Sequence, residues 1–391
     1  MNTSRILVFF ESSGMKRRLV FVVNSLDSFE SHRFPIAVSA LKEGYDVFIV
    51  YGESRTAKLS KFVSIGIKLI KVSGRRGSTN IFLEVIYALG LFSVVRKLKP
   101  DLIHLITLKP ILYGGIAAWL CSVPALVIAV TGMGSIIIKR SLIASAYKAL
   151  IRSALRIVTL HPNHTIIVQN IDDKADLIAW GVAKSKNVRL IAGSGVDLGQ
   201  FCMTDERDEI PVVTFLGRLI KDKGFNEFVD AVRILRNRGI LARFWVVGSP
   251  DYENPTSVSK NELEKLSEEN VVELLGYREN VNEIYKETNI VCLPSYREGL
   301  PKSLIEAAAC GRSIVTTDVP GCRDAITPDV TGFLVPAKAP NVLADKIQTL
   351  IENPNLRKQM GGAGRALAEK TFAIEKIVSQ HLEIYKDLQN E

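Results

Sequence analysis

Short runs of apolar residues recur along the chain, and most are separated by longer stretches with helical patterning. Apolar runs without polar alternation are typical of parallel strands that helices cover on both faces. A regular succession of such strands and helices predicts an α/β fold with doubly wound parallel sheets. The strands are predicted at 18–24, 46–51, 67–72, 101–106, 125–130, 165–169 and 188–191, and then at 211–216, 242–247, 271–275, 289–293, 313–317 and 332–335.

The two series of strands are separated by a Gly-rich segment from Ile191 to Phe201, which predicts a domain boundary. A chain of 391 residues is long for one core and suits two domains. We expect a first domain over residues 1–195, a second over 205–372 and an amphipathic helix over 373–391. Residues 1–14 hold a further strand-like run, which is either an extension or an extra edge strand.

The stretch from Asn289 to Asp318 reads as strand, sharp loop, helix and strand. Gly299 in the loop permits unusual backbone angles, and Pro301 suits a first helical turn. In an open parallel sheet, this loop and the start of the helix at 303–310 would lie where ligands bind. Unpaired backbone N–H groups and the helix dipole would favour a phosphate there.

Two carboxylates frame this anion site, Glu298 in the loop and Glu306 early in the helix. A carboxylate beside a phosphate is unfavourable unless it binds another group, and sugar hydroxyls are the usual alternative. The spacing by itself leaves a second explanation open, in which Glu306 caps the helix and Glu298 is solvated.

The segment from Ser295 to Gly311 carries Glu298 and Glu306 as an E-x7-E motif and resembles the signature of retaining glycosyltransferases of family 4. The resemblance extends over about residues 15–390, with further motifs in the family's order. It implies the GT-B architecture, in which two Rossmann-like domains face each other across a deep cleft. The C-terminal helix would cross back to the first domain.

The resemblance implies a donor site in the second domain. Arg218 and Lys223 match the family's phosphate site, and with Glu298, which would contact the donor sugar, they are the expected catalytic residues. Two fixed cations stabilise the charge that a departing nucleotide diphosphate gains. Nothing resembles an Asp-x-Asp metal site, and no metal or other cofactor is expected. The donor-binding residues that the resemblance implies are Gly217, Tyr277, Arg278, Gly299, Leu300, Pro301 and Glu306, with Glu306 on the ribose hydroxyls.

Residues Asn24 to Ile36 lie at the first strand-to-helix turn, where Ser28 or Ser31 is expected to cap the helix. The S-H-R-F-P segment is similar to that of family-4 enzymes in capsule and O-antigen synthesis. That similarity implies an acceptor site in which Arg33 binds a phosphate and His32 a hydroxyl. An arginine in a first turn is also often a surface ion-pair partner, and this alternative stays open.

Thr131 and Gly132 end the strand at 125–130, at a position where many GT-B enzymes have a histidine. We therefore expect no histidine-assisted step there, and expect the glycine to let backbone amides approach the sugar on the acceptor side. The segment from Ile167 to Asp173 resembles a Q-N-x-D-D run of the same branch. We assign it no role beyond helix capping by Asp172 and Asp173.

Charge is unevenly distributed. Residues 1–195 carry 26 Lys and Arg against 11 Asp and Glu, a net charge of +15, whereas the remainder has a net charge of −6. A basic first half predicts a polyanionic partner, and no nucleic-acid-binding signature accompanies it. Basic residues at 148, 152 and 156 recur every fourth position within the apolar stretch 136–158. Such a helix favours contact with an anionic membrane surface, although a solvated domain helix would look the same.

The chain is expected to be cytoplasmic and peripheral at the inner face of the cytoplasmic membrane. No signal peptide is visible, and the uncharged run at 110–138 is interrupted by Gly and Pro, which favours buried core over a membrane span. Five scattered cysteines without a C-x-x-C motif indicate a reduced compartment and no zinc site.

These patterns lead to one preferred hypothesis: a membrane-associated, retaining glycosyltransferase of surface polysaccharide synthesis. It would move a hexose or N-acetylhexosamine from a UDP-sugar to a polyprenyl-diphosphate-linked saccharide. The alternatives are a NAD-dependent or sugar-nucleotide-modifying Rossmann enzyme, disfavoured because the first turn lacks G-x-G-x-x-G, and a GT-B binding protein without turnover.

Overall fold

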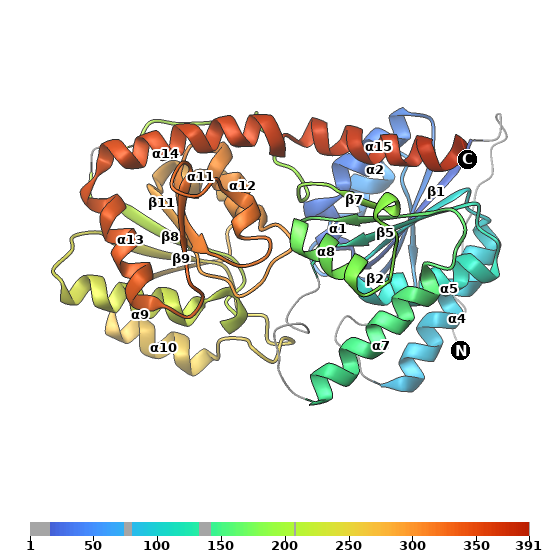
Figure 1. Cartoon of the computed structure of the whole chain (residues 1–391), viewed down its shortest axis with the longest axis horizontal. Coiled ribbons are helices and arrows are strands. Elements are labelled where there is room, and N and C mark those ends of the chain that lie inside the picture. Colours follow the sequence, from blue (N-terminus) through green and yellow to red (C-terminus); the bar gives the residue numbers. More distant parts are fainter. Residues whose placement is uncertain (1–15, 74–79, 133–141, 207–208, 391) are drawn as a thin grey trace.

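The computed structural model describes residues 16–73, 80–132, 142–206 and 209–390. These residues form two separate parallel sheets with helices on both faces, so the predicted GT-B fold is confirmed (Figure 1). Each of the thirteen predicted strands forms within two residues of its expected bounds. The strand-like run predicted at residues 1–14 lies outside the described residues.

The first sheet has seven strands in the order β3-β2-β1-β4-β5-β6-β7. Their interior positions are almost all buried apolar side chains, because helices cover both faces. The strand order reverses between β1 and β4, which are paired in parallel. The strands are β1 (Arg18–Ser25), β2 (Asp46–Glu53), β3 (Lys68–Lys71), β4 (Leu102–Ile106), β5 (Ala125–Val130), β6 (His164–Val168) and β7 (Val188–Leu190).

Helices α4, α5 and α7 cover one face of this sheet, and α1, α2 and the C-terminal helix α15 (Ile374–Asn390) cover the other. The apolar run at 110–138 divides between α5 and β5 as far as it is described, as the glycine and proline positions predicted. The helices of the first domain are α1 (Leu26–His32), α2 (Phe34–Lys42), α3 (Leu59–Val63), α4 (Ile81–Leu98), α5 (Leu108–Leu120), α7 (Leu142–Val158) and α8 (Ile171–Ala179).

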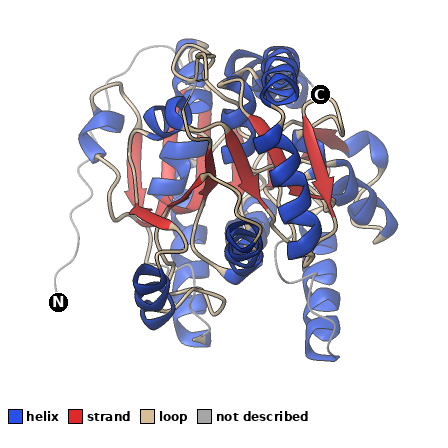
Figure 2. Ribbon diagram, turned by 90° about the vertical axis from the view of Figure 1, so that its left-hand side faces the viewer, coloured by secondary structure: helices blue, strands red, loops and turns tan. Residues whose placement is uncertain are grey.

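The second sheet has six strands in the order β10-β9-β8-β11-β12-β13, again all parallel and with one reversal, between β8 and β11. Figure 2, in which the second domain faces the viewer, shows helices on both sides of its strands. The strands are β8 (Val212–Leu216), β9 (Arg243–Val247), β10 (Glu273–Gly276), β11 (Ile290–Leu293), β12 (Ser313–Thr317) and β13 (Gly332–Val335). The helices of this domain are α9 (Phe225–Asn237), α10 (Lys260–Glu269), α11 (Val281–Glu287), α12 (Lys302–Ala309), α13 (Pro340–Glu352) and α14 (Pro354–Leu367).

The chain crosses between the two sheets twice, and the two crossings are hydrogen-bonded to each other. Val196 N donates to Phe372 O at 2.8 Å, and Ile374 N donates to Val196 O at 3.0 Å. Beyond this point α15 runs along the first domain and packs on α2, β5 and β6 (Figure 1). Besides the paired crossings, the loops and helix ends at the facing edges of the two sheets also contact each other, as in the pair of Arg297 with Asp173.

Candidate active site

Most of the predicted donor residues lie at the carboxyl edge of the second sheet, near the point where its strand order reverses. β8 continues into Gly217 and Arg218, and the neighbouring β11 continues into the loop from Pro294 to Pro301, named here the Glu298 loop. Chains that leave adjacent strands in opposite directions create a crevice for ligands at this point. Gly248, after β9, lies so close that a Cβ on it would stand 1.8 Å from the Gly217 carbonyl oxygen. The backbones that follow β8 and β9 are therefore in direct contact.

Lys223 and Glu298 are brought together by a turn that only glycine fits. Gly224 caps α9 with a φ of 72°, and a Cβ on it would stand 2.0 Å from the Pro294 carbonyl oxygen. This approach holds the turn against the Glu298 loop, so that Lys223 Nζ lies 2.5 Å from Glu298 Oε1. Ser295 Oγ donates to the same oxygen at 2.6 Å. The carboxylate is thus fixed by one cation and one hydroxyl.

Arg218 lies closer to solvent, with its Nη1 2.6 Å from Asp251 Oδ2. Both predicted phosphate-binding cations therefore contact carboxylates of their own domain. An incoming diphosphate would compete with Asp251 for Arg218 and with Glu298 for Lys223. Two cations at one crevice, each paired with a single carboxylate oxygen, suit an anion of higher charge.

Glu306 lies in the second turn of α12 and is only 4% exposed. Its Oε1 lies 3.3 Å from Lys302 Nζ, and its Oε2 lies 3.2 Å from the Tyr285 hydroxyl. Burial raises the pKa of Glu306, and the Lys302 cation and the Tyr285 hydroxyl act against that rise. Tyr285 comes from α11 and has no motif around it, so sequence reasoning missed it.

Tyr277 and Arg278 lie further out, at the end of the edge strand β10, and Tyr277 is 69% exposed. Together with the first turn of α11 they line an open depression of about 500 Å³. Because α11 also carries Tyr285, this helix connects the depression to Glu306.

The backbone of the first domain touches the Glu298 loop at two glycines. Gly132 has a φ of 109°, and a Cβ on it would stand 2.9 Å from Gly299 N. A Cβ on Gly299 would stand 2.5 Å from Thr131 O and 2.3 Å from Gln169 Oε1. Thr131 and Gly132 are thus adjacent to the Glu298 loop, and their place on the acceptor side stays a prediction. Residues 133–135 of the same motif lie outside the described residues.

His32 is the last residue of α1 and Arg33 follows it, and their side chains have different hydrogen-bond partners. His32 Nδ1 lies 3.2 Å from Ser194 Oγ, and burial together with nearby cations, of which Lys302 contributes most, lowers its pKa to about 3. His32 is therefore neutral beside the site. Arg33 is 2% exposed, reaches Gly193 O at 3.4 Å, and has its pKa lowered to about 10 by burial. The structure does not bring this guanidinium together with the other predicted residues.

Two predicted helix caps are wrong. Helix α1 begins directly after β1, and its cap is Ser25, whose hydroxyl accepts a hydrogen bond from the Ser28 amide. Helix α8 is capped by Asn170, whose side chain accepts from Asp173 N at 2.7 Å, so Asp172 and Asp173 do not cap it. In both cases the cap comes within two residues of the preceding strand's end and reaches a free amide of the first turn.

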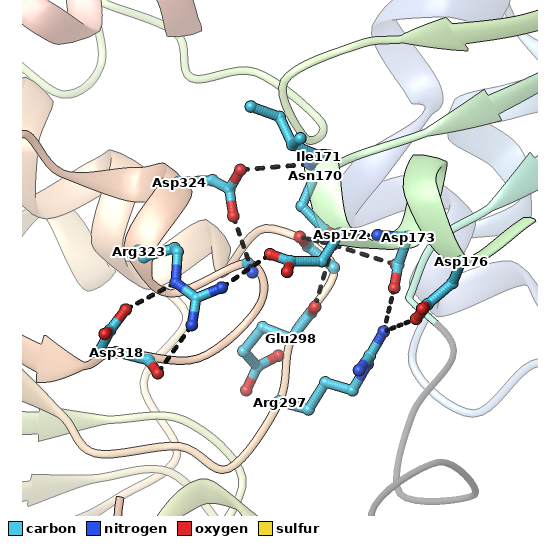
Figure 3. A network of polar contacts seen from close by, with 12 residues as sticks. Asn170, Ile171, Asp172, Asp173, Asp176, Arg297, Glu298, Asp318, Arg323 and Asp324 are labelled. Carbon is cyan, nitrogen blue, oxygen red and sulfur yellow. Dashed lines mark hydrogen bonds and ion pairs between the residues drawn. The ribbon is translucent and has the colours of Figure 1, made fainter. Parts of the chain in front are cut away.

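The Q-N-x-D-D segment instead binds the second domain (Figure 3). Asn170 Nδ2 donates to Gly299 O at 2.8 Å, and Asp173 Oδ1 lies 2.5 Å from Arg297 Nη2. Sequence reasoning missed Arg297 although it precedes Glu298 directly. The cluster of carboxylates was visible in the sequence, but its partners come from more than 120 positions away.

The site as a whole gathers two cations, two carboxylates, a helix N-terminus and a glycine-lined approach from the opposite domain. This combination suits a ligand that joins a diphosphate to a group rich in hydroxyls. Within the described ranges, no three His, Cys, Asp or Glu side chains come together as a metal ion would require.

Two family models match the chain in succession. The model described as "Glycosyl transferases group 1" matches residues 203–367, and "Glycosyl transferase 4-like" matches residues 20–167. Among solved structures, Anabaena Alr3699/HepE in complex with UDP and glucose superposes with a TM-score of 0.75 at 19% identity, over 94% of this chain and 99% of that one. Sucrose-phosphate synthase from Thermosynechococcus elongatus gives a TM-score of 0.78 at 18% identity, over 95% and 99% of the two chains.

Three curated relatives align over most of their own length. The N,N'-diacetylbacillosaminyl-diphospho-undecaprenol alpha-1,3-N-acetylgalactosaminyltransferase of Campylobacter jejuni is 29% identical, over 94% of this chain and 98% of that protein. The capsular polysaccharide biosynthesis glycosyltransferase CapM of Staphylococcus aureus is 24% identical, over 88% and 90%. The UDP-Gal:alpha-D-GlcNAc-diphosphoundecaprenol alpha-1,3-galactosyltransferase of Escherichia coli is 23% identical, over 75% and 76%. The two facing sheets, the crevice at the switch point of the second sheet and the matches across both domains agree: the chain is an enzyme that belongs to the family-4, group 1 glycosyltransferases.

Proposed function

We propose that this glycosyltransferase moves a hexose or N-acetylhexosamine from a UDP-sugar to a polyprenyl-diphosphate-linked saccharide, with retention of anomeric configuration. The observation that carries the proposal is the convergence of Arg218, Lys223 and Glu298 beside the buried Glu306 at one switch point. The relatives named above, two of which act on diphospho-undecaprenol-linked sugars, support this acceptor class, and HepE bound to UDP supports the donor class.

In this proposal each side chain has one role. Lys223 and Arg218 exchange their carboxylate partners for the two phosphates of UDP and stabilise the charge that develops on them. Glu298, released from Lys223, binds a hydroxyl of the donor sugar, while Glu306 binds the ribose. The base lies in the depression beside Tyr277 and Arg278, and the acceptor approaches over His32, Thr131 and Gly132.

The transfer needs no protein base. The bond between the anomeric carbon and the β-phosphate oxygen breaks as the acceptor hydroxyl oxygen forms a bond to the same carbon from the same face. The hydroxyl proton passes to the departing phosphate, which leaves as UDP. Because His32 holds a strongly lowered pKa, it serves as a neutral hydrogen-bonding group here and not as a proton store.

We further propose that the first domain lies against the cytoplasmic face of the membrane. The first three turns of α4 support this, because Ile81, Phe82 and Leu89 are each more than 60% exposed, and further apolar side chains between them also face solvent. Lys109 at the start of α5 pairs with Glu84, so the first turn of α4 extends past α5 at the carboxyl edge of the sheet. Exposed apolar clusters of this kind mark interaction surfaces.

Helix α7 flanks α5 on its other side, and in Figure 1 both α4 and α7 extend beyond the lower side of the first domain. Arg152 of the predicted basic stripe is exposed beside Leu150. Arg156 contacts the Trp180 carbonyl of its own domain, and residues 139 and 140 lie outside the described residues. No helix among the described residues is long and apolar enough to cross a membrane. Peripheral contact through apolar tips and positive charge is the mode that fits these helices.

A donor screen without added metal tests the proposed activity. UDP-, GDP- and ADP-sugars are compared by thermal shift, and the stabilising donor is then assayed with a polyprenyl-diphosphate-linked saccharide. We expect one UDP-sugar to stabilise the protein and to be consumed only with acceptor present. Binding of a sugar nucleotide with neither transfer nor hydrolysis would indicate a binding protein and contradict the proposal.

Vesicle sedimentation tests the membrane contact independently. The chain should sediment with phosphatidylglycerol-rich vesicles and much less with neutral ones. Replacing both Ile81 and Phe82 by serine should weaken vesicle binding about ten-fold or more, because burying each apolar side chain in the membrane contributes about 2 kcal/mol to the binding free energy. The control replaces Leu241 and Val330 of the second domain by serine, since both are apolar side chains that are more than half exposed. Equal sedimentation of both pairs would refute the assigned surface.

A further inference from the structure

A short acidic segment of the first domain binds the loop that carries Glu298 in the second. Asn170, at the start of α8, is fully buried, and its side-chain amide donates to Gly299 O at 2.8 Å and lies 3.3 Å from Glu298 O. Asn170 Nδ2 also lies 3.0 Å from Asp173 Oδ2. A single side chain of the first domain thus binds the backbone of the predicted sugar-contacting residue and of its neighbour.

The residue before Glu298 is bound by the same helix. Arg297 Nη2 lies 2.5 Å from Asp173 Oδ1 and 3.1 Å from Asp176 Oδ2 (Figure 3). The Asp173 side chain is 0% exposed, and burial raises its pKa while Arg297 opposes that rise. Removing a carboxylate from water is unfavourable unless a cation compensates it, so Asp173 is well placed only while Arg297 is present.

Arg323 and Gly321 of the second domain make further contacts beside the Glu298 loop. Arg323 Nη1 lies 2.9 Å from Asp172 Oδ2, and its Nε lies 2.6 Å from Asp318 of its own domain. Gly321, nearby, supports the Glu298 loop directly, because a Cβ on it would stand 2.5 Å from the carbonyl oxygens of Glu298 and Gly299. The Glu298 loop therefore lies between Gly321 on one side and Asn170 on the other.

The contacts of Asn170 with Gly299 and of Arg297 and Arg323 with the aspartates of α8 join residues of two domains, so they are lost when the domains separate. Their free energy therefore contributes to the equilibrium between open and closed arrangements more than to the folding of either domain. The backbone approach of Gly132 to Gly299 depends on the same closure. Because the loop they hold also carries Glu298, closure and the orientation of that carboxylate are linked.

We propose that Asn170, Asp172, Asp173, Asp176, Arg297 and Arg323 form an interdomain clasp whose function is to position Glu298 when the domains close. This role rests on the proposed function of Glu298 at the donor sugar. The clasp residues are positioning residues: they touch neither donor nor acceptor, and act through the backbone on either side of Glu298. The fully assembled site then exists only in the closed arrangement, in which the acceptor domain is already in place.

The test compares Asp173→Asn with a control of equal burial in the whole protein. Glu206→Gln serves as control, since Glu206 pairs with Arg357 inside the second domain and both side chains are about 5% exposed or less. Three quantities are measured for each variant: kcat with UDP-sugar and acceptor, the Kd for UDP, and the radius of gyration by X-ray scattering. UDP reports on the donor site without requiring closure.

For Asp173→Asn we expect kcat to fall about ten-fold or more, because a modest shift towards the open arrangement lowers the competent fraction by that factor. The Kd for UDP should stay within about three-fold of the wild-type value, a change in binding free energy well below the 1.4 kcal/mol that a tenfold change would need. The radius of gyration should increase. Glu206→Gln should not combine a lower kcat and a larger radius of gyration with an unchanged Kd for UDP. Arg297→Lys, which keeps the cation, should retain clearly more activity than Arg297→Met.

An unchanged kcat and an unchanged radius of gyration in Asp173→Asn would overturn the proposal. Equal losses of kcat and UDP affinity, matched by Glu206→Gln, would also overturn it, because a general loss of folding would then explain both. Should Asp173→Asn not fold, the half-exposed Asp172 and Asp176 provide Asp172→Asn and Asp176→Asn for the same measurements. If the wild type transfers no sugar, the proposed function fails, while the scattering comparison still decides whether the clasp closes the domains.

Discussion

Replacing Lys223 by methionine removes one positive charge from the donor site and keeps most of the side chain's packing. In the structure the ammonium lies 2.5 Å from Glu298, and both side chains are less than one-fifth exposed. A unit charge about 4 Å from a phosphate oxygen is worth roughly 4 kcal/mol at the effective dielectric of such a partly buried site. Most of this attraction grows as the diphosphate departs, because the leaving group gains negative charge in the transition state.

We therefore expect Lys223→Met to lower kcat/KM by about 10²-fold, which corresponds to roughly 3 kcal/mol at the transition state. Folding should be affected much less. Glu298 keeps its hydrogen bond from Ser295 Oγ, and a partly exposed ion pair contributes about 1 kcal/mol or less. The two effects can therefore be separated by measuring activity and thermal stability on the same sample.

The assay is the initial rate of UDP release over a range of donor concentrations with acceptor held constant. Lys221→Met is the matched control, because Lys221 belongs to the same turn but pairs with Glu262 at 3.3 Å, away from Glu298. Lys223→Arg should recover part of the loss. A Lys223→Met variant within about five-fold of wild type, equivalent to only 1 kcal/mol, would refute the assignment of the leaving-group site.

Three further predictions concern closure, pH and the buried carboxylate. Gly299→Ala should abolish most turnover and leave UDP binding in place, because the added Cβ would collide with Thr131 and Gln169 of the first domain. Gly362→Ala is the control: a Cβ there has no neighbour within 4 Å, so this variant should match the wild type in turnover and in UDP binding. Burial lowers the pKa of His381 and that of His32 each to about 3, and that of His104 well below its usual range, so the unfolded chain takes up protons that the fold rejects. The free energy of unfolding should therefore fall from pH 7 to pH 5, by about 2 kcal/mol for His381 alone and by more with the other two, and a flat urea-denaturation profile would contradict this. Glu306→Gln should leave the free energy of unfolding at pH 7 unchanged or higher, because burial raises the pKa of that carboxyl and so disfavours its charged form. The same variant should lower kcat/KM about 10²-fold. Loss of stability without loss of rate would assign Glu306 to folding alone.

Much of the fold could be predicted because it depends on local patterns. A strand buried on both faces must be apolar at nearly every position, and this requirement marks β1 and β11 in the sequence without reference to any neighbour. The site at the end of β11 could be placed for a related reason, since a loop between a parallel strand and a helix always lies at the carboxyl edge. The E-x7-E spacing then identified which loop to consider.

Other features depend on contacts between distant parts of the chain, and the sequence contains no local sign of them. Arg33 was expected to face an acceptor, but α15, more than 340 positions later, covers it and leaves it 2% exposed. Tyr285 behind Glu306 belongs to the same class, because a tyrosine on a short helix is ordinary until α12 packs beside it.

The sequence by itself determined that this protein has two parallel α/β units, where its anion-binding loop lies and which charged residues surround that loop. The tertiary structure decided how those charges are paired: Lys223 with Glu298, Lys302 with Glu306, and Arg297 with Asp173 of the opposite domain. The physical reason is that burial and ion pairing are properties of a three-dimensional neighbourhood. A strand shows its environment in its own composition, whereas a carboxylate does not show which cation will neutralise it.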